Sequence, residues 1–375
     1  MNENEEFQEP LDPELFPNEL VDESDGWEFA LINKMKRDAL DKIGFDPANM
    51  KKEETRFLVT SYYAIQKARL QLEGRKRALD ALDSSTSMVK FIHSGLSNSE
   101  SNIKKMLGIY SASQPIGRWA ESIPGVGPVI SSALISHIDI EKAPTVGRIW
   151  RFAGLDPTSE WLGREKATAL VNSVIPQRST STEATDEQIA EIATKANRQA
   201  DRLRQQALGY APEDKPVVTK SLLIKVLSRR PYNADLKLVC WKLGNSFVPI
   251  ADKPSKTKGP DIYGKIYKDR KVLEIQRNES GLNADLADDK KGTVDRSTDA
   301  YAAYSMGMLP KGQIHQRACR YAAKFFLSHW HHVRYEMEYG TLPPKPFVIE
   351  HLGHQEYIKP PHWVDGEVVC DCHQR

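Results

Sequence analysis

A short glycine-containing turn has the clearest capacity for chemistry in this sequence. Glycine adopts backbone angles closed to other residues and lets a phosphate approach the main chain closely. The N–H groups of such a turn, and of a helix that starts directly after it, would face that phosphate with partial positive charge. The alternative is an ordinary glycine-rich connection between packed helices. The turn consists of Ile123, Pro124, Gly125, Val126 and Gly127.

The residues around the turn favour the phosphate-binding interpretation. A helix is expected to end near Ser122, and Pro128 suits the first turn of the next helix because its missing N–H would be unpaired there anyway. Apolar residues then recur at helical spacing through 129–138. The pattern predicts a helix-hairpin-helix element, which positions a protein on the DNA backbone without reading base sequence.

Basic residues concentrate in 215–275, which holds fourteen Lys or Arg against five Asp or Glu, although the whole chain has a net charge of only +1. Such a regional excess indicates a surface for a polyanion, and the alternative is a solvated helix face. Tyr263 and Tyr267 either stack on bases there or belong to the core. The basic residues expected to contact DNA are Arg148, Arg229, Arg230, Lys237, Lys242, Lys265, Lys268, Arg270 and Lys271.

The histidines and cysteines do not form a recognised metal site. His315 and Cys319 are four residues apart, as two ligands on one helix would be, but no further pair completes a tetrahedral set. The sequence therefore predicts no bound metal and no cofactor, and a divalent metal would enter only with a nuclease activity. A zinc site near the C-terminus would also need the usual Cys-x2–4-Cys spacing. That spacing is absent among the histidines and cysteines there, which are His351, His354, Cys370, Cys372 and His373.

The elements that must position these residues are helices, so the predicted fold class is mostly α. It comprises a helical N-terminal region, a central helix-hairpin-helix domain and a helical C-terminal region. Residues 254–259 and 281–297 are typical of polar connectors, and the proline-rich stretch from 343 predicts an extended tail packed over the helices. Helical periodicity is found in 27–43, 51–81, 99–110, 113–122, 186–208, 217–228, 234–248, 259–279 and 311–339.

Changes in composition divide the chain into six predicted segments. The first holds ten acidic residues and no basic one, and such an arm can fold back on a basic groove and compete with DNA. The segments are an acidic flexible arm (1–26), a helical domain (27–112), the helix-hairpin-helix domain (113–175), a Ser/Thr-rich loop with a polar helix (176–216), a basic helical domain (217–342) and the extended tail (343–375).

Composition also excludes several classes of protein. The chain has 375 residues, 40% of them apolar, which is enough for folded cores. No apolar run reaches the roughly 18 residues of a membrane helix. The N-terminus lacks the basic region followed by an apolar region that is typical of a signal peptide. Four cysteines do not make a disulfide scaffold. We therefore expect an intracellular, cytoplasmic protein with no membrane partner, associated with the nucleoid if its source is prokaryotic.

The residues after the hairpin carry a family resemblance. They run Ser136-His-Ile-Asp-Ile-Glu-Lys-Ala-Pro-Thr-Val-Gly-Arg-Ile-Trp-Arg-Phe-Ala-Gly-Leu-Asp-Pro157. With the hairpin before it, this segment resembles the C-terminal domain of insertion-sequence transposases that join a DEDD, RNase H-like nuclease to a helix-hairpin-helix domain. Looser similarity in 229–247, 263–271 and 308–324 extends the resemblance over roughly 115–345.

The resemblance implies specific partners and one catalytic residue. The partner is DNA, duplex or branched, and members of the family can also use a structured guide RNA, which nothing in this sequence requires. The family's serine nucleophile follows its Gly-Leu-x-Pro segment, where Ser159 is the positional match, although Ser159 would also suit the N-cap of a helix before Trp161. The family's nuclease domain has no counterpart in this sequence, because the acids of 1–26 lie in a proline-rich arm and 27–110 is typical of helices.

Three functions follow from these observations. The first is a DNA-binding protein of transposition and recombination of a mobile element, which grips the backbone through the 123–128 hairpin and the basic helices. The second is a strand-transfer enzyme with diverged serine chemistry. The third is a non-enzymatic protein-interaction module in which the hairpin is only structural. A second copy of the chain, forming a homo-oligomer, is considered as a further partner.

Overall fold

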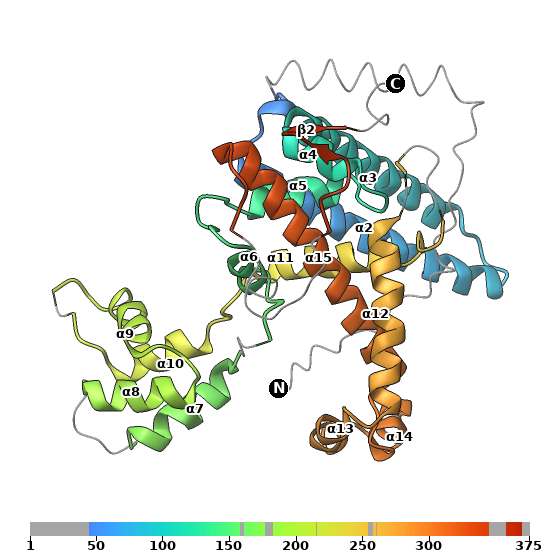
Figure 1. Cartoon of the computed structure of the whole chain (residues 1–375). Helices are drawn as coiled ribbons and strands as arrows, with labels where there is room; N and C mark the ends of the chain where they lie inside the picture. The colour runs from blue at the N-terminus through green and yellow to red at the C-terminus, as the bar shows by residue number, and fades with distance from the viewer. Residues whose placement is uncertain are drawn as a thin grey trace.

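The computed structural model describes residues 45–157, 161–176, 183–214, 216–253, 258–259, 261–344 and 358–369. Within these ranges the protein is built almost entirely of helices, with one small two-stranded sheet (Figure 1). The predicted mostly α fold class is confirmed. The acidic arm, the helix predicted in 27–43, Ser159, His351, His354, Cys370, Cys372 and His373 lie outside the described residues.

Two long helices, α2 (Lys52–Ala81) and α3 (Ser87–Ser113), follow the short 3-10 helix η3 (Pro47–Asn49) and pack against each other. An ion pair joins them, with Arg69 Nε 2.7 Å from Glu100 Oε2. The prediction for α2 is confirmed. The prediction of 99–110 for the next helix was wrong at its start, because packing against α2 extends α3 over a serine-rich stretch of weak intrinsic helix propensity.

A central bundle combines segments from both halves of the chain. It comprises α4 (Pro115–Glu121), α5 (Pro128–His137), α6 (Val146–Phe152), α11 (Ala234–Ser246), α12 (Ile262–Glu279) and α15 (Lys311–Tyr339). Aromatic rings join these helices: Trp119 stacks on Phe326 with centroids 5.5 Å apart, and Phe247 stacks on Tyr263 at 5.0 Å. Such pairs add to the stability gained by burying their large apolar area.

A second hydrophobic core belongs to the four-helix subdomain, which we define as α7 (Gly163–Val174), α8 (Asp186–Lys195), α9 (Ala200–Leu208) and α10 (Lys220–Ser228). In Figure 1 it stands apart from the bundle, beyond α6. Its core includes the fully buried Ile192, Leu203 and Leu223. The four helices therefore bury their apolar faces against one another.

The single helix predicted over 186–208 is instead two helices, so that prediction was wrong. Helix α8 ends in a Schellman motif, in which the N–H groups of Asn197 and Arg198 donate to the carbonyls of Thr194 and Ala193. Asn197 has a φ of 51°, a left-handed conformation that asparagine tolerates better than most residues. The break lets α9 turn back and pack against α8.

The prediction that 281–297 is a polar connector was also wrong, because this segment contains the helix α13 (Ala284–Lys291). Helix α14 (Asp299–Ser305) follows it. The two helices pack together over a small core that includes Tyr304 and Ile314. Ala287 is the buried residue that the structure describes in α13. The segment therefore had no apolar stripe that could have revealed a helix.

The described part of the tail, 358–369, packs over the helices as the sequence predicted. It forms the antiparallel pair β1 (Trp363–Val364) and β2 (Glu367–Val368). The Trp363 indole Nε1 donates to Glu336 Oε2 of α15 at 2.7 Å, and the Trp119 indole of α4 donates to the Pro361 carbonyl at 2.8 Å. These bonds fix the tail beside the hairpin that follows α4.

Candidate nucleic-acid interface

The hairpin between α4 and α5 has an inner and an outer side. Ile123 and Val126 are each only 1% exposed and belong to the central core. Gly125 has a φ of +83°, and a Cβ added there would lie 2.9 Å from the Ser246 carbonyl oxygen at the end of α11. Gly127, the N-cap of α5, has no neighbouring atom within 4 Å of an added Cβ. The hairpin therefore turns Gly125 toward the protein and Gly127 toward open space.

Other segments cover the inner side of the hairpin. Lys258 Nζ donates to the Val126 carbonyl at 3.3 Å, and His362 Nδ1 lies 3.0 Å from Ser122 Oγ. Burial lowers the pKa of both Lys258 and His362. Gly127 and the start of α5 form the other side of the hairpin, where helix N–H groups without a side-chain cap could face an anion.

The basic residues predicted to contact DNA have different surroundings in the structure. Lys268 forms an ion pair with Asp252, and Lys242 is half-buried over the Tyr63 ring at 4.3 Å. Lys237 lies 4.2 Å over Tyr232, and Lys271 lies 5.8 Å over Tyr267. Arg148 and Lys265 are exposed. Arg229 and Arg230 lie beside the four-helix subdomain, and Arg270 lies on α12.

Tyr263 and Tyr267 belong to the core, so stacking on bases is the wrong alternative for them. The Tyr263 hydroxyl lies 2.7 Å from His329 Nδ1, and the Tyr267 hydroxyl lies 2.8 Å from His315 Nδ1. They are 1% and 4% exposed. Burial raises the pKa of Tyr267 to about 12, so both rings act as neutral packing groups.

A cavity of about 510 Å³ between α12 and α15 brings together several cations from these two helices. We call it the α12–α15 groove. Its lining holds five cations against one carboxylate, and it reaches the Ala-Gly-Leu-Asp-Pro segment at Pro157. It is lined by Leu155, Pro157, Arg270, Glu274, Arg277, Leu282, Asn283, Arg317, Arg320, Tyr321 and Lys324.

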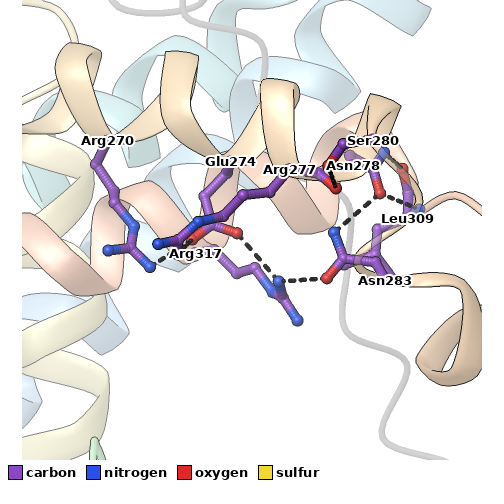
Figure 2. A network of polar contacts seen from close by, with 8 residues as sticks. All are labelled: Arg270, Glu274, Arg277, Asn278, Ser280, Asn283, Leu309 and Arg317. Carbon is purple, nitrogen blue, oxygen red and sulfur yellow. Dashed lines mark hydrogen bonds and ion pairs between the residues drawn. The ribbon is translucent and has the colours of Figure 1, made fainter.

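Glu274 organises the guanidinium groups of the groove (Figure 2). Its side chain is 2% exposed, and its two oxygens lie 2.5 Å from Arg270 Nη2 and 3.0 Å from Arg317 Nη1. Arg277 Nη1 is 3.8 Å away. Burial alone would raise the pKa of Glu274, but hydrogen bonds from Arg317 and Arg270 outweigh it and lower that pKa. The carboxylate is therefore ionised at neutral pH and fixes the arginines in place.

The positive charge of the groove exceeds what Glu274 compensates. Burial lowers the pKa of Arg320 and of Lys324, and the neighbouring cations Arg317 and Arg270 lower them further. Lys324 also lies 4.7 Å over the Trp150 ring, which limits its freedom. Cations held close together in a partly buried cavity create a positive potential that attracts an anion.

The sequence analysis missed most of this groove, although a signal was present. Arg270, Glu274 and Arg277 are spaced i, i+4, i+7 on α12. Arg317, Arg320 and Lys324 are spaced i, i+3, i+7 on α15. Each trio therefore occupies one face of its helix. The spacing did not reveal that the two faces meet, because that depends on how the helices pack.

Within the described ranges, no group of three His, Cys, Asp or Glu residues is arranged to hold a metal ion. His315 Nε2 and Cys319 Sγ do lie 3.6 Å apart, but burial raises the pKa of Cys319 to about 12. In the same ranges no helix is long and apolar enough to span a membrane.

One family comparison matches the segment that carries the hairpin. Residues 118–171 match the model of the Transposase IS116/IS110/IS902 family. No curated protein and no solved structure matches the chain. The matched segment contains the hairpin, α5, α6 and most of α7. The resemblance to insertion-sequence transposases is confirmed there, and it supports a role in the transposition of a mobile element, with DNA as the partner such a family implies.

Proposed function

We propose that this relative of the insertion-sequence transposases binds the sugar–phosphate backbone of DNA in the α12–α15 groove. The observation that carries the proposal is the buried carboxylate of Glu274, which pairs in Figure 2 with arginines that also line the cavity. Guanidinium groups match phosphate geometry and form short, charge-assisted hydrogen bonds. Such contacts would hold duplex or branched DNA without reading its sequence.

The open side of the hairpin supplies a second backbone contact in this proposal. Helix α5 has no side-chain cap at Gly127, so its first N–H groups remain available. A phosphate there would interact favourably with the helix N-terminus, and the absence of a side chain at Gly127 lets it approach. The basic helices and the hairpin would together position the chain on DNA.

The test removes Arg320 and Lys324, which are not among the arginines paired with Glu274, so the network in Figure 2 stays intact. Labelled linear duplex and four-way-junction DNA are titrated by fluorescence anisotropy at several salt concentrations. We expect Arg320→Gln/Lys324→Gln to flatten the slope of log K against log [salt] by about 2. The matched control, Lys311→Gln/Arg334→Gln, removes the same charge from α15 outside the groove and should keep the wild-type slope.

Two outcomes would refute DNA binding in the groove. One is equal loss of affinity in the groove variant and in its control, which would indicate nonspecific attraction to net charge. The other is no measurable binding of either DNA by the wild type at low salt. In that case the hairpin is a packing device, and the protein-interaction module becomes the leading function.

A second candidate function is serine-dependent strand transfer. Pro157 lines the groove, and Ser159 follows it two residues later in the sequence. In such a reaction the Ser159 hydroxyl oxygen would bond to a DNA phosphorus, the bond to one deoxyribose oxygen would break, and that oxygen would take a proton. Arginines at the groove would stabilise the charge on the phosphorane-like transition state.

Strand transfer predicts a covalent protein–DNA adduct. Supercoiled DNA would be incubated with the wild type and with Ser159→Ala, with and without a divalent metal, and denatured before electrophoresis. An adduct that requires Ser159 supports this function. Unaltered DNA with both proteins, while the groove still binds it, leaves only the binding function.

A further inference from the structure

A second basic cavity lies where the four-helix subdomain joins α6. It has a volume of about 1020 Å³, and we call it the α9–α10 pocket. Five arginines line it, and the lining contains no acidic residue. These arginines come from α6, from the turn after α8, from α9 and from the segment after α10: Arg151, Arg198, Arg202, Arg229 and Arg230.

The end of helix α8 positions Arg198 in this pocket. The left-handed Asn197 ends α8 and directs the next residue inward, where Arg198 N–H closes the Schellman motif at 2.8 Å from the Ala193 carbonyl. Arg198 Nη2 is buried, and no hydrogen-bond partner for it is found among the described residues. Burial and the like charge of Arg202 lower the pKa of Arg198. A buried donor without an acceptor is costly unless a ligand satisfies it.

Aromatic rings orient the two arginines on the other side of the pocket. The Arg229 guanidinium lies 5.5 Å from the centroid of Tyr210, and the Arg230 guanidinium lies 4.9 Å from that of Trp161. Lys225 lies over the same Tyr210 ring at 4.4 Å. A guanidinium held over an aromatic ring loses freedom of movement, so these contacts help to fix both arginines at the pocket.

Two carboxylates of α8 are paired with cations that are not part of the pocket lining. Asp186 lies 2.6 Å from Arg204, and Glu191 lies 2.8 Å from Lys195. Arg151 pairs with Asp156, its Nε lying 3.2 Å from Asp156 Oδ2. The α12–α15 groove has Glu274 to compensate its arginines, but the α9–α10 pocket has no such group in its lining.

We propose that the α9–α10 pocket binds a second stretch of phosphodiester backbone, on a strand distinct from the one in the groove. Five guanidinium groups spread over four segments fit several successive phosphates better than one isolated anion. The pocket belongs to a subdomain with its own core, so it does not need the groove to be filled. One chain would thus hold two nucleic-acid strands at once.

The test counts strands bound per chain. Full-length protein is titrated at low salt with fluorescein-labelled single strands of about eight nucleotides, as DNA in one arm and RNA in the other. The pocket variant is Arg198→Gln/Arg202→Gln. Its matched control, Lys195→Gln/Arg204→Gln, removes the same charge from α8 and α9 by breaking two exposed ion pairs of little energetic weight. Circular dichroism melts confirm that each variant is folded.

The proposal gives a different result for each variant. The wild type should bind about two strands, and the pocket variant about one, with a salt slope shallower by about 1.4 for its lost contacts. The control should behave as the wild type. Arg320→Gln/Lys324→Gln should lose the other strand. If the groove binds no nucleic acid but the pocket does, the wild type will bind one strand, and the pocket variant will lose it while the groove variant keeps it.

Three results would overturn the proposal. The first is an unchanged number of bound strands in the pocket variant. The second is an equal loss of binding in the control. The third is binding of poly-glutamate in the pocket when no oligonucleotide strand binds there. The last would identify an acidic polypeptide as the ligand. Binding of the DNA strand, the RNA strand or both supports the proposal and identifies the source of the phosphates.

Discussion

Adding a single methyl group at Gly125 tests how the hairpin is held. An alanine there must keep a φ of +83°, and its Cβ would lie 2.9 Å from both the Ser246 carbonyl oxygen and Ile250 Cδ1. The carbonyl belongs to the last turn of α11 and cannot rotate away. Gly127 is the natural control, because its φ of −115° suits any residue and an added Cβ meets no atom within 4 Å.

The expected cost at Gly125 has two parts. An L-residue in the left-handed region loses about 1–2 kcal/mol. Forcing extra volume against a fixed neighbour costs about 1–3 kcal/mol. Gly125→Ala should therefore lower the free energy of unfolding by about 2–5 kcal/mol. Gly127→Ala should change it by less than about 0.5 kcal/mol, as surface substitutions usually do.

The assay is urea unfolding followed by tryptophan fluorescence, since Trp119 is fully buried beside the hairpin. The two variants are compared with the wild type at the same pH and protein concentration. If Gly125→Ala unfolds within about 0.5 kcal/mol of the wild type, the close contact with α11 does not constrain the hairpin and the reasoning is refuted. Gly127→Ala should keep the wild-type stability and weaken DNA binding, because its methyl group occupies the proposed path of the phosphate.

Two further predictions concern buried ionisable groups. His329 is 3% exposed, and burial lowers its pKa to about 4. Because this folded pKa is below the unfolded value of about 6.5, the stabilisation is fully present above pH 6.5 and is lost as pH falls toward 4, by about 2 kcal/mol between pH 6.5 and 5. Urea unfolding at several pH values should show this slope in the wild type and a flatter one in His329→Gln; equal slopes would contradict the assignment. Glu274→Gln removes the charge that pairs with Arg270 and Arg317, whose side chains are 25% and 28% exposed. We expect the free energy of unfolding to fall by about 2 kcal/mol. Breaking a fully buried pair costs more, about 3–5 kcal/mol. An unchanged urea midpoint would show that these pairs add no net stability.

Local patterns carried much of the secondary structure. The apolar stripes of α2 and α15 predicted both helices closely, because a long amphipathic helix repeats its signal over many turns. Helix α13 and the start of α3 lacked that signal, since packing against neighbours stabilises them. The break after α8 depends on Asn197, whose left-handed conformation the sequence permits but does not require.

Several predictions remain as the sequence left them. The six segment boundaries, the guide RNA, the homo-oligomer and the role of the acidic arm stay predictions. The hydrophobic cores do not follow the predicted segments one by one. One core contains residues from 50–155, 236–333 and 363, and the second contains residues from 167–227.

The sequence by itself determined the hairpin, because a Pro-Gly-x-Gly turn between two helices is set by local backbone chemistry. It also determined the regional excess of basic residues, which is a matter of counting. Only the tertiary structure decided which cations meet. The arginines of α12 and α15 share a cavity through a helix crossing, and Arg198 meets Arg229 through the fold of the four-helix subdomain. Charge acts through space, so its chemistry depends on distances that sequence spacing does not contain.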